Sequence, residues 1–516
     1  MENNITLSIE QKFAFQQFKK GHNLFITGPG GTGKTQLIKH LVEYMINLNI
    51  NHKVCAMTGC AAVLLKCSAS TLHSWSGIKL AKGETQKILN SVLRNKKALE
   101  SWRGVKVLII DEISMMSQKI FELCDLIGKH VRKNDKPFGG IQIIFTGDFF
   151  QLPPVGDKDG NDSTSKFCFQ SKNWFHTFKL ENHILLKTIF RQNDPTYIDI
   201  LMQIREGKLD EKNIQILKQY VRRPVKDENG YVPTKLFAVR SKTDFVNSSM
   251  YSKIQDEEFV YNGIDRTDCA LWLDSQKPFD SELRKICQSL SYDDKTYLLK
   301  QFKTNANILE NVSLKKGSLV MCTYNVDVEI GICNGSQGVI IDFVQSSKTN
   351  CKIPIVSFNN GITSAIDYQF YQSEEFPCLA IGQIPLCLAW ALTIHKIQGS
   401  TLKDADIDLG NSIFEYGQSY VGLSRVKSLE GLYLSAFVPH RIKSNPLVQE
   451  FYQKIPVIDY SELLPKISTL EQEIINNELV EETYEKDTNT KKIVLENNIF
   501  ESFACTNSPT TKRLYL

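Results

Sequence analysis

Residues 28–35 read Gly-Pro-Gly-Gly-Thr-Gly-Lys-Thr, between the apolar run Leu24-Phe25-Ile26-Thr27 and a stretch with helical spacing over residues 36–47. A strand, a glycine-rich turn and a helix in this order are typical of a nucleotide-binding P-loop. The glycines let successive backbone N–H groups converge on phosphate oxygens, and the helix N-terminus adds its positive dipole end. The octet therefore predicts that the chain binds a nucleoside triphosphate.

Each residue of this loop is a candidate nucleotide contact. The loop residues are Gly28, Pro29, Gly30, Gly31, Thr32, Gly33, Lys34 and Thr35. In such a loop the lysine reaches the outer phosphates, and the hydroxyl that follows it holds Mg²⁺. We therefore expect ATP and Mg²⁺ as cofactors of the chain.

Length and composition indicate an ordinary globular protein. The 516 residues suggest roughly three or four domains, and 42% hydrophobic with 23% charged residues is usual for soluble proteins. No apolar stretch approaches the roughly 20 residues that span a bilayer, and the first residues lack a signal-peptide pattern. We expect an intracellular protein with no membrane partner.

The charge of the chain is unevenly distributed. The net charge is +4, but residues 457–516 hold 11 Asp and Glu against 6 Lys and Arg, which leaves +9 on residues 1–456. A mildly basic body fits a polyanionic partner, although an ordinary solvated surface explains the same count. Charge alone does not identify the partner.

Two further strand-like runs end in side chains suited to nucleotide chemistry. The run 105–110 ends in Asp111 and Glu112. In a P-loop enzyme such a carboxylate ligates Mg²⁺, and an adjacent Glu polarises the attacking water. The run 141–145 leads to a loop with Gln151, whose amide can hydrogen-bond a γ-phosphate at this edge of a doubly wound sheet. The alternative for Gln151 is an exposed side chain on a turn stiffened by proline.

Three more side chains are candidates for the nucleotide site. Gln11, about one helix before the P-loop, can both donate to and accept from the N6 and N7 edge of adenine. Arg191 and Arg425 are candidates for stabilising the transition state. The plainer alternatives are a surface amide and surface salt bridges. Only the order of the surrounding motifs favours the functional roles.

The order of these motifs resembles that of superfamily 1 helicases. The matching segments are Gln11, residues 28–35, 58–62, 71–75, Asp111-Glu112, residues 147–151, Arg191, and residues 389–399 and 417–425. The stretch 121–140, which ends Lys136-Pro137-Phe138-Gly139-Gly140, is similar to the signature of the PIF-type (petite integration frequency) 5′-to-3′ DNA helicases, relatives of RecD. The resemblance covers roughly residues 5–455, in order and with plausible spacing.

The resemblance implies an α/β fold with two RecA-like P-loop lobes that bind ATP between them. It implies a small β-barrel insert in the second lobe and a short wedge insert in the first. The catalytic residues it implies are Lys34, Glu112, Gln151, Arg191 and Arg425, and the metal ligands are Thr35 and Asp111. Both arginines would come from the second lobe. Closure of the cleft on ATP, and reopening after hydrolysis, would move the protein along a strand.

The resemblance also implies a track for single-stranded DNA across both lobes. Its candidate contacts are Thr58, Thr71, His73 and Trp75 in the first lobe, and Thr393, His395 and Lys396 in the second. Hydroxyls and Lys hold phosphates regardless of sequence, and an aromatic ring such as that of Trp75 can stack on a base. The alternatives are a Trp in the core and a His with an internal hydrogen bond.

We expect four regions along the chain. They are a first lobe at 1–182 with its wedge at 77–104, a second lobe at 183–250 and 385–456, an insert at 251–384, and an acidic, flexible tail at 457–516. The wedge segment is basic without strong periodicity, so a solvated helix is the alternative. Short strands with turn signals suggest a β-barrel in the second half of the insert, whereas 251–311 shows no clear pattern.

Two hypotheses for the function follow. The leading one is an ATP-dependent 5′-to-3′ DNA helicase, acting as a monomer on single-stranded, forked or tailed DNA in replication, repair or recombination, with telomere maintenance among the roles of the family. It would work in the nucleus or at another site of DNA replication. The alternative is an ATP-gated single-strand-binding or remodelling factor without productive unwinding. RNA is a lesser possibility, because backbone contacts without 2′-OH readout distinguish the sugars poorly.

Overall fold

A computed structural model gives the structure of the chain. It describes residues 7–456 and 458, apart from 59–60, 63–64, 66, 68, 80, 157–161, 226–232, 269–286, 288, 307, 325, 328–329, 333–334, 347–350, 374–375, 377 and 400. The chain divides into two compact units, residues 17–456 and residues 1–16 with 457–516. The predicted acidic tail, except for residue 458, lies outside the described residues. None of the helices in the described ranges has both the length and the apolar character needed to cross a bilayer.

The smaller unit contains the start of helix α1 (Ile9–Lys19). Ser8 and Gln11 exchange two hydrogen bonds at this helix start, from Ser8 N to Gln11 Oε1 at 2.9 Å and from Gln11 N to Ser8 Oγ at 3.3 Å. This Ser-x-x-Gln pair is a capping box, which satisfies N–H groups that have no partner within the helix. Gln11 therefore has a structural role in α1, and its contact with adenine stays a prediction.

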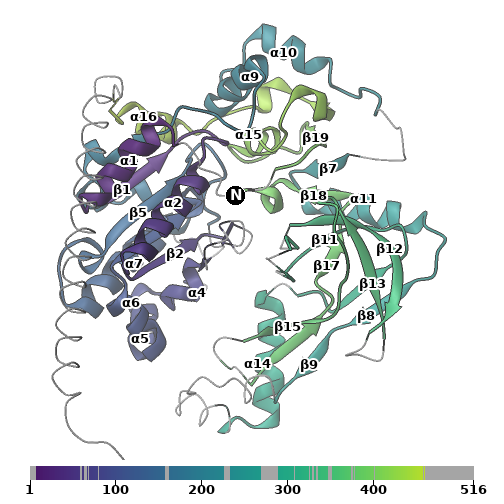
Figure 1. Cartoon of the computed structure of the whole chain (residues 1–516), viewed down its shortest axis with the longest axis horizontal. Coiled ribbons are helices and arrows are strands. Elements are labelled where there is room, and N and C mark those ends of the chain that lie inside the picture. Colours follow the sequence, from purple (N-terminus) through teal and green to yellow (C-terminus); the bar gives the residue numbers. More distant parts are fainter. Residues whose placement is uncertain are drawn as a thin grey trace, which may run out of the picture. The chain divides into compact units, whose positions relative to one another are not determined.

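The first sheet has six strands, all paired in parallel, in the order β3-β2-β4-β5-β1-β6. Figure 1 labels β1, β2 and β5 of this sheet. The strands are β1 (Leu24–Thr27), β2 (His52–Ala56), β3 (Ser70–Thr71), β4 (Val107–Asp111), β5 (Gln142–Gly147) and β6 (His183–Leu185). Helix α7 (Gln118–Arg132) shares a hydrophobic core with β4 and β5. Both β1 and β4 are buried throughout, as expected where helices cover both faces of a parallel sheet. Parallel pairing brings the carboxyl ends of β1, β4 and β5 to one edge, where ligands bind.

The second sheet has four parallel strands in the order β18-β7-β19-β20. The strands are β7 (Thr234–Phe237), β18 (Ala391–Thr393), β19 (Ala405–Leu409) and β20 (Leu432–Phe437). Helices α9 (Pro195–Glu206) and α15 (Gln418–Leu423) contribute Tyr197 and Tyr420 to the core of this sheet. The predicted α/β class is therefore confirmed, with two separate parallel sheets.

Two segments differ from the predicted lobe boundaries. Strand β6 begins at residue 183 and pairs with β1, so the first sheet extends beyond residue 182. Helix α16 (Pro446–Gln453) joins the core of the first sheet, because Phe451 stacks on Phe169 with 4.3 Å between the ring centroids. The chain thus returns to the first lobe after the second sheet is complete. Aromatic packing between segments this far apart in sequence has no local signal.

The basic segment 77–104 forms two helices, α5 (Thr85–Arg94) and α6 (Lys96–Gly104). The buried residues of α5 are Ile88, Leu89 and Val92. These residues lie on one helical face, so the interpretation of this segment as lacking strong periodicity is wrong for α5. In α6, Trp102 is fully buried and its indole N–H donates to Ser76 O at 3.1 Å. Both helices pack on the first core, and their action as a wedge stays a prediction.

The insert between helix α11 (Arg240–Ser252) and β18 contains three antiparallel sheets, with the orders β14-β13-β12-β11-β17, β15-β16-β9 and β10-β8. Its elements are β8 (Phe259–Asn262), β9 (Ile264–Arg266), α14 (Tyr292–Ala306), β10 (Asn311–Leu314), β11 (Leu319–Cys322), β12 (Gln337–Gln345), β13 (Lys352–Phe358), β14 (Thr363–Ala365), β15 (Gln369–Gln372), β16 (Ala380–Gln383) and β17 (Leu386–Leu388). Among the described strands, β14 and β17 are edges and do not pair with each other. Closure of this sheet into a barrel therefore stays a prediction.

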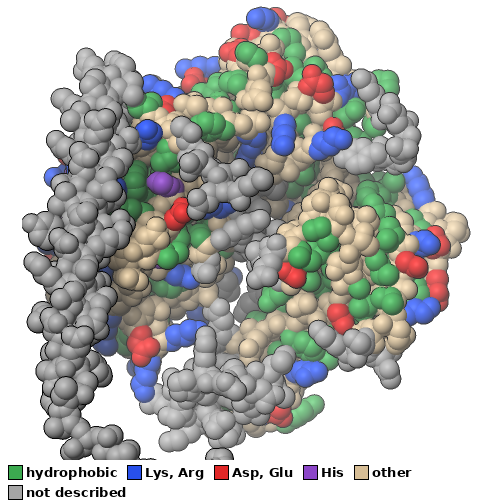
Figure 2. Space-filling view, viewed as in Figure 1, with side chains coloured by type: hydrophobic (Ala, Val, Ile, Leu, Met, Phe, Trp, Pro, Cys, Tyr) green, Lys and Arg blue, Asp and Glu red, His purple; other side chains and the backbone are tan. Residues whose placement is uncertain are grey.

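Charged side chains of both signs are interspersed on the face drawn in Figure 2. The net charge of +9 on residues 1–456 is not gathered into one large basic field on the visible part of that face.

Candidate active site

The P-loop has backbone conformations that require glycine. Helix α2 (Lys34–Asn47) begins directly after Gly33, which has φ 76°. A Cβ atom added to Gly28 would lie 2.4 Å from Leu186 O, and one added to Gly31, which has φ 91°, would lie 2.7 Å from Arg191 Cβ. Neither approach is compatible with a side chain. The loop is thus held between β1 and the segment that follows β6, with its N–H groups at the N-terminus of α2.

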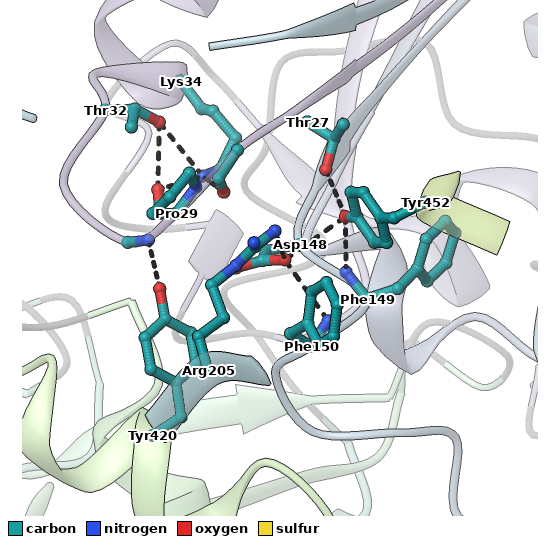
Figure 3. A network of polar contacts seen from close by, with 12 residues as sticks. Thr27, Pro29, Thr32, Lys34, Asp148, Phe149, Phe150, Arg205, Tyr420 and Tyr452 are labelled. Carbon is teal, nitrogen blue, oxygen red and sulfur yellow. Dashed lines mark hydrogen bonds and ion pairs between the residues drawn. The ribbon is translucent and has the colours of Figure 1, made fainter. Parts of the chain in front are cut away.

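Lys34 folds back onto this loop (Figure 3). Its Nζ donates to Gly28 O at 2.7 Å and to Pro29 O at 2.9 Å. Burial lowers the pKa of Lys34 to about 8, although the carboxylates of Asp148 and Glu112 oppose this shift. A phosphate group would give this ammonium a charged partner in place of two carbonyl oxygens.

ATP affinity should fall as the pH rises above about 8, the pKa of Lys34 in the nucleotide-free protein. Bound phosphate would keep Lys34 protonated, so above this pH ATP binding takes up a proton, and Kd should rise about tenfold per pH unit. Well below pH 8, Lys34 is protonated in both states and contributes no pH dependence. Titration of a fluorescent ATP analogue between about pH 7 and pH 9 measures this. Lys34→Met should bind the ATP analogue more weakly, and its Kd should not change with pH. A Kd of the native protein that stays constant over this pH range would contradict the expectation.

Two adjacent carboxylates lie at the end of β4, with Asp111 as its last residue and Glu112 directly after it. Asp111 Oδ1 accepts a hydrogen bond of 2.5 Å from Thr146 Oγ1, and burial together with Glu112 raises the pKa of Asp111 to about 6. Glu112 has φ 54° and ψ 45°, a left-handed conformation that is uncommon for residues other than glycine. Its Oε2 accepts a hydrogen bond from Gln398 Nε2 at 3.0 Å. Strained backbone of this kind is concentrated at functional sites, where surrounding contacts hold it.

Gln151 is buried at the carboxyl end of β5, with 5% of its surface exposed. Its backbone N–H donates to Asp148 O at 2.9 Å, and its Oε1 has no hydrogen-bond partner among the described residues. A Cβ added to Gly417 would lie 2.6 Å from Gln151 O, so the start of α15 touches this loop. A half-turn of the Gln151 amide exchanges its oxygen and nitrogen, so the same position can present N–H groups to a phosphate.

The two predicted arginines lie close together. Arg191 Nη1 donates to Ser424 O at 2.9 Å, while Arg425 Nη2 donates to Ser424 Oγ at 2.9 Å. Burial and the neighbouring Arg191 lower the pKa of Arg425 to about 9. A buried and a partly buried cation side by side are an arrangement that a triphosphate would stabilise. Arg191 lies in the segment between β6 and α9, where it packs on Gly31, and its assignment to the second lobe stays a prediction.

The chain is similar to known proteins in both sequence and fold. A family model described as "PIF1-like helicase" matches residues 6–215, and one described as "DNA helicase Pif1, 2B domain" matches residues 298–343. A solved structure of the Pif1 helicase from Candida albicans is similar over 87% of this chain and 98% of its own length, with 34% identity and a TM-score of 0.70. The chain belongs to the PIF1-like helicase family.

Two other relatives of this PIF1-like chain are informative. The "ATP-dependent DNA helicase PIF1" of Xenopus laevis is 32% identical over 457 residues, which cover 88% of this chain and 65% of the relative. The chain spans 56% to 65% of the length of this and three other curated relatives named PIF1. A solved Bacteroides Pif1 bound to ssDNA is 26% identical, with a TM-score of 0.61 and coverage of 87% of this chain and 97% of its own. These likenesses confirm the two RecA-like lobes.

In the PIF1-like chain, the predicted DNA contacts of the first lobe follow β2 and β3. Thr71 is the N-cap of α4 (Leu72–Ser76), and its Oγ1 accepts from Ser74 N at 3.3 Å. Thr58 Oγ1 accepts from Ala61 N at 3.2 Å, and burial lowers the pKa of His73. The Trp75 ring is half-buried, and its centroid lies 4.7 Å from that of Trp102. Trp75 thus packs partly on the first core, as the alternative to a DNA contact predicts.

The predicted DNA contacts of the second lobe lie together at the end of β18 and in the short helix that follows it. Thr393 is the N-cap of the short helix η6 (Ile394–Ile397), which carries His395 and Lys396. Lys396 is exposed, whereas burial lowers the pKa of His395. The two groups of contacts thus follow strand ends in both sheets, and contact with DNA stays a prediction.

One ion pair of the PIF1-like site was not anticipated. Arg205 of α9 donates to both oxygens of Asp148, from Nε to Oδ2 at 2.9 Å and from Nη2 to Oδ1 at 2.8 Å (Figure 3). Tyr452 Oη of α16 lies 3.2 Å from Asp148 Oδ1 and 2.5 Å from Thr27 Oγ1. Although burial lowers it, Asp148 raises the pKa of Arg205 above its ordinary value. Asp148 lies in the motif at residues 147–151, but no local sequence pattern identifies its partners.

A tyrosine hydroxyl also contacts the P-loop. Tyr420 Oη of α15 accepts a hydrogen bond from Gly30 N at 2.8 Å (Figure 3). Burial and Asp148 raise the pKa of Tyr420 to about 12, so the group stays a hydroxyl near neutral pH. An N–H group of the loop that points at an oxygen from the second lobe is suited to a phosphate oxygen as well.

Proposed function

We propose that the chain is an ATP-dependent DNA helicase that moves 5′ to 3′ along single-stranded DNA. The observation that supports this most is the meeting of both lobes at one P-loop. Tyr420 contacts Gly30, and Gln398 contacts Glu112, in each case from the second lobe to the first. A nucleotide at this loop would contact both lobes, so its binding and hydrolysis would change how they meet.

The chemistry of hydrolysis follows from the charges around the loop. The loop N–H groups and Lys34 would bind the phosphates, and Glu112 would take a proton from the water that attacks the γ-phosphorus. Arg191 and Arg425 would stabilise the charge that develops on the transferred group. Gln151 would hydrogen-bond the γ-phosphate and lose that bond after hydrolysis.

Mg²⁺ is the metal that the oxygen ligands of Thr35 and Asp111 fit. Thr35 and Asp111 would hold it, and the bound ion would neutralise phosphate charge. The raised pKa of the buried Asp111 supports this assignment, because a divalent cation stabilises the ionised carboxylate. In the described part of the chain, no three His, Cys, Asp or Glu side chains gather as a metal site. Phosphates and water would therefore supply the rest of the coordination, as is usual for Mg²⁺.

Single-stranded DNA would lie along the strand ends of both sheets. The Bacteroides relative was solved with ssDNA, which supports the same ligand class for this chain. Hydroxyls and the exposed Lys396 would bind phosphates, which carry no sequence information. Changes in the cleft would then move one lobe along the strand relative to the other. The protein would act on forked or tailed DNA in replication, repair or recombination.

Strand separation tests this function directly. A duplex with a 5′ single-stranded tail should be unwound by the protein with ATP and Mg²⁺, whereas the same duplex with a 3′ tail should remain intact. Lys34→Met should unwind neither, because phosphate binding loses its cation. Preference for the 3′ tail would refute the direction, and ATP hydrolysis without any unwinding would favour the remodelling factor.

A further inference from the structure

Gln398 is a buried side chain that joins the second lobe to the predicted catalytic base. Its Nε2 donates to Glu112 Oε2 at 3.0 Å, and 5% of its surface is exposed. Glu112 follows β4 of the first sheet, while Gln398 comes directly after η6 of the second. Because Glu112 has a strained backbone, contacts from outside its own segment decide where its carboxylate points.

Gln398 Oε1 is buried and makes no hydrogen bond within the part of the chain that the structure describes. A buried acceptor of this kind destabilises the protein unless water or a ligand satisfies it. This oxygen belongs to the amide that holds the Glu112 carboxylate, so a water molecule there would meet two acceptors.

The position of Gln398 also relates it to the predicted DNA contacts. Helix η6 carries His395 and Lys396, begins after Thr393, and has Gln398 as its C-cap. These residues are separated by at most a few positions of one short helix, so a strand that binds there cannot shift η6 without shifting Gln398. The amide is therefore placed to report the presence of DNA to Glu112.

We propose that Gln398 is a positioning residue for ATP hydrolysis. Its N–H group holds the Glu112 carboxylate, and its Oε1 accepts a hydrogen bond from one O–H of the attacking water. The other O–H donates to Glu112, which takes that proton as the oxygen bonds to the γ-phosphorus and the bond to ADP breaks. DNA at η6 fixes this arrangement, so the strand accelerates hydrolysis. This role rests on the proposed function, in which Glu112 is the base.

Steady-state ATP hydrolysis by the full chain, with and without oligothymidine, tests the proposal. Gln398→Ala should lower the DNA-stimulated kcat by about 10- to 100-fold, with little change in KM for ATP or in the Kd for the oligonucleotide. Gln398→Glu has the same size but sets a carboxylate against Glu112, so it should be at least as harmful as Gln398→Ala. Gln142→Ala is the matched control, because Gln142 is the first residue of β5, at the end of the strand opposite to the site. Its Nε2 donates to Phe18 O and His22 O. It should hydrolyse ATP as the wild type does.

Three outcomes would overturn this role. Gln398→Ala with the DNA stimulation of the wild type would show that the amide does not position the base. A milder effect of Gln398→Glu than of Gln398→Ala would show that Gln398 only fills space. A loss explained by KM or by the Kd for the oligonucleotide would make it a binding residue. Thermal melting of each variant identifies misfolding, and a wild type without ATP hydrolysis would overturn the proposed function as well.

Discussion

Glu112→Gln should abolish ATP hydrolysis and unwinding while ATP and single-stranded DNA still bind. The substitution keeps the size of the side chain and removes the group that takes the proton from water. General-base catalysis contributes about 10²- to 10⁴-fold, so a loss of kcat in this range is expected. Binding should survive, because the phosphate contacts come from the P-loop and Lys34. Phosphate release and nucleotide binding, measured on the same preparation, give the two quantities.

Glu122→Gln is the matched control for this exchange. Glu122 lies in α7 of the same lobe, where its Oε1 accepts from Gln118 Nε2 at 2.9 Å and from Ser171 Oγ at 2.8 Å. It takes no part in the proposed chemistry, so this variant should hydrolyse ATP normally. Unwinding that persists in Glu112→Gln would refute the assignment of the base.

Arg205→Ala should destabilise the protein by about 3–5 kcal/mol, because it leaves the buried Asp148 carboxylate without its cation. Both side chains are almost completely buried, with exposures of 6% for Arg205 and 0% for Asp148. The guanidinium also lies over the Phe150 ring, 4.2 Å from its centroid, so packing is lost together with charge. Urea unfolding of the wild type and the variant measures the difference.

The matching double variant separates the charge from the packing. Asp148→Asn combined with Arg205→Met removes both charges, so it should recover much of the stability that Arg205→Ala loses. Arg240→Ala is the control, since Arg240 pairs with Asp244 at 3.6 Å on the surface with exposures of 68% and 64%. It should unfold like the wild type. Wild-type stability of Arg205→Ala would show that the pair is not needed to hold Asp148.

Local sequence predicts the parts of the site that belong to single segments. The P-loop, the carboxylates at the end of β4 and the amide after β5 each follow a buried apolar run, and parallel pairing brings them to one edge. Such runs have a period and a length that can be read without any partner. The α/β class and the two lobes follow from these local patterns together with the order of the motifs.

Contacts between distant segments could not be predicted in this way. Gln398 and Glu112 are 286 positions apart, and Arg205 and Asp148 are 57 apart. Any of many amides and arginines could meet these carboxylates, and only the packing of the lobes selects the partner. The return of α16 to the first core depends likewise on aromatic packing that the local sequence of α16 does not predict. The apolar face of α5 was readable, but the many basic residues around it concealed its spacing.

Displacement of streptavidin from biotinylated oligonucleotides tests the central claim most directly. A motor that moves 5′ to 3′ pushes toward the 3′ end, so streptavidin should leave a 3′-biotinylated strand in an ATP-dependent reaction and remain on a 5′-biotinylated one. Glu112→Gln should displace neither. Removal from the 5′ end, or no ATP-dependent removal by protein that binds the strand and hydrolyses ATP, would contradict the account of a 5′-to-3′ motor.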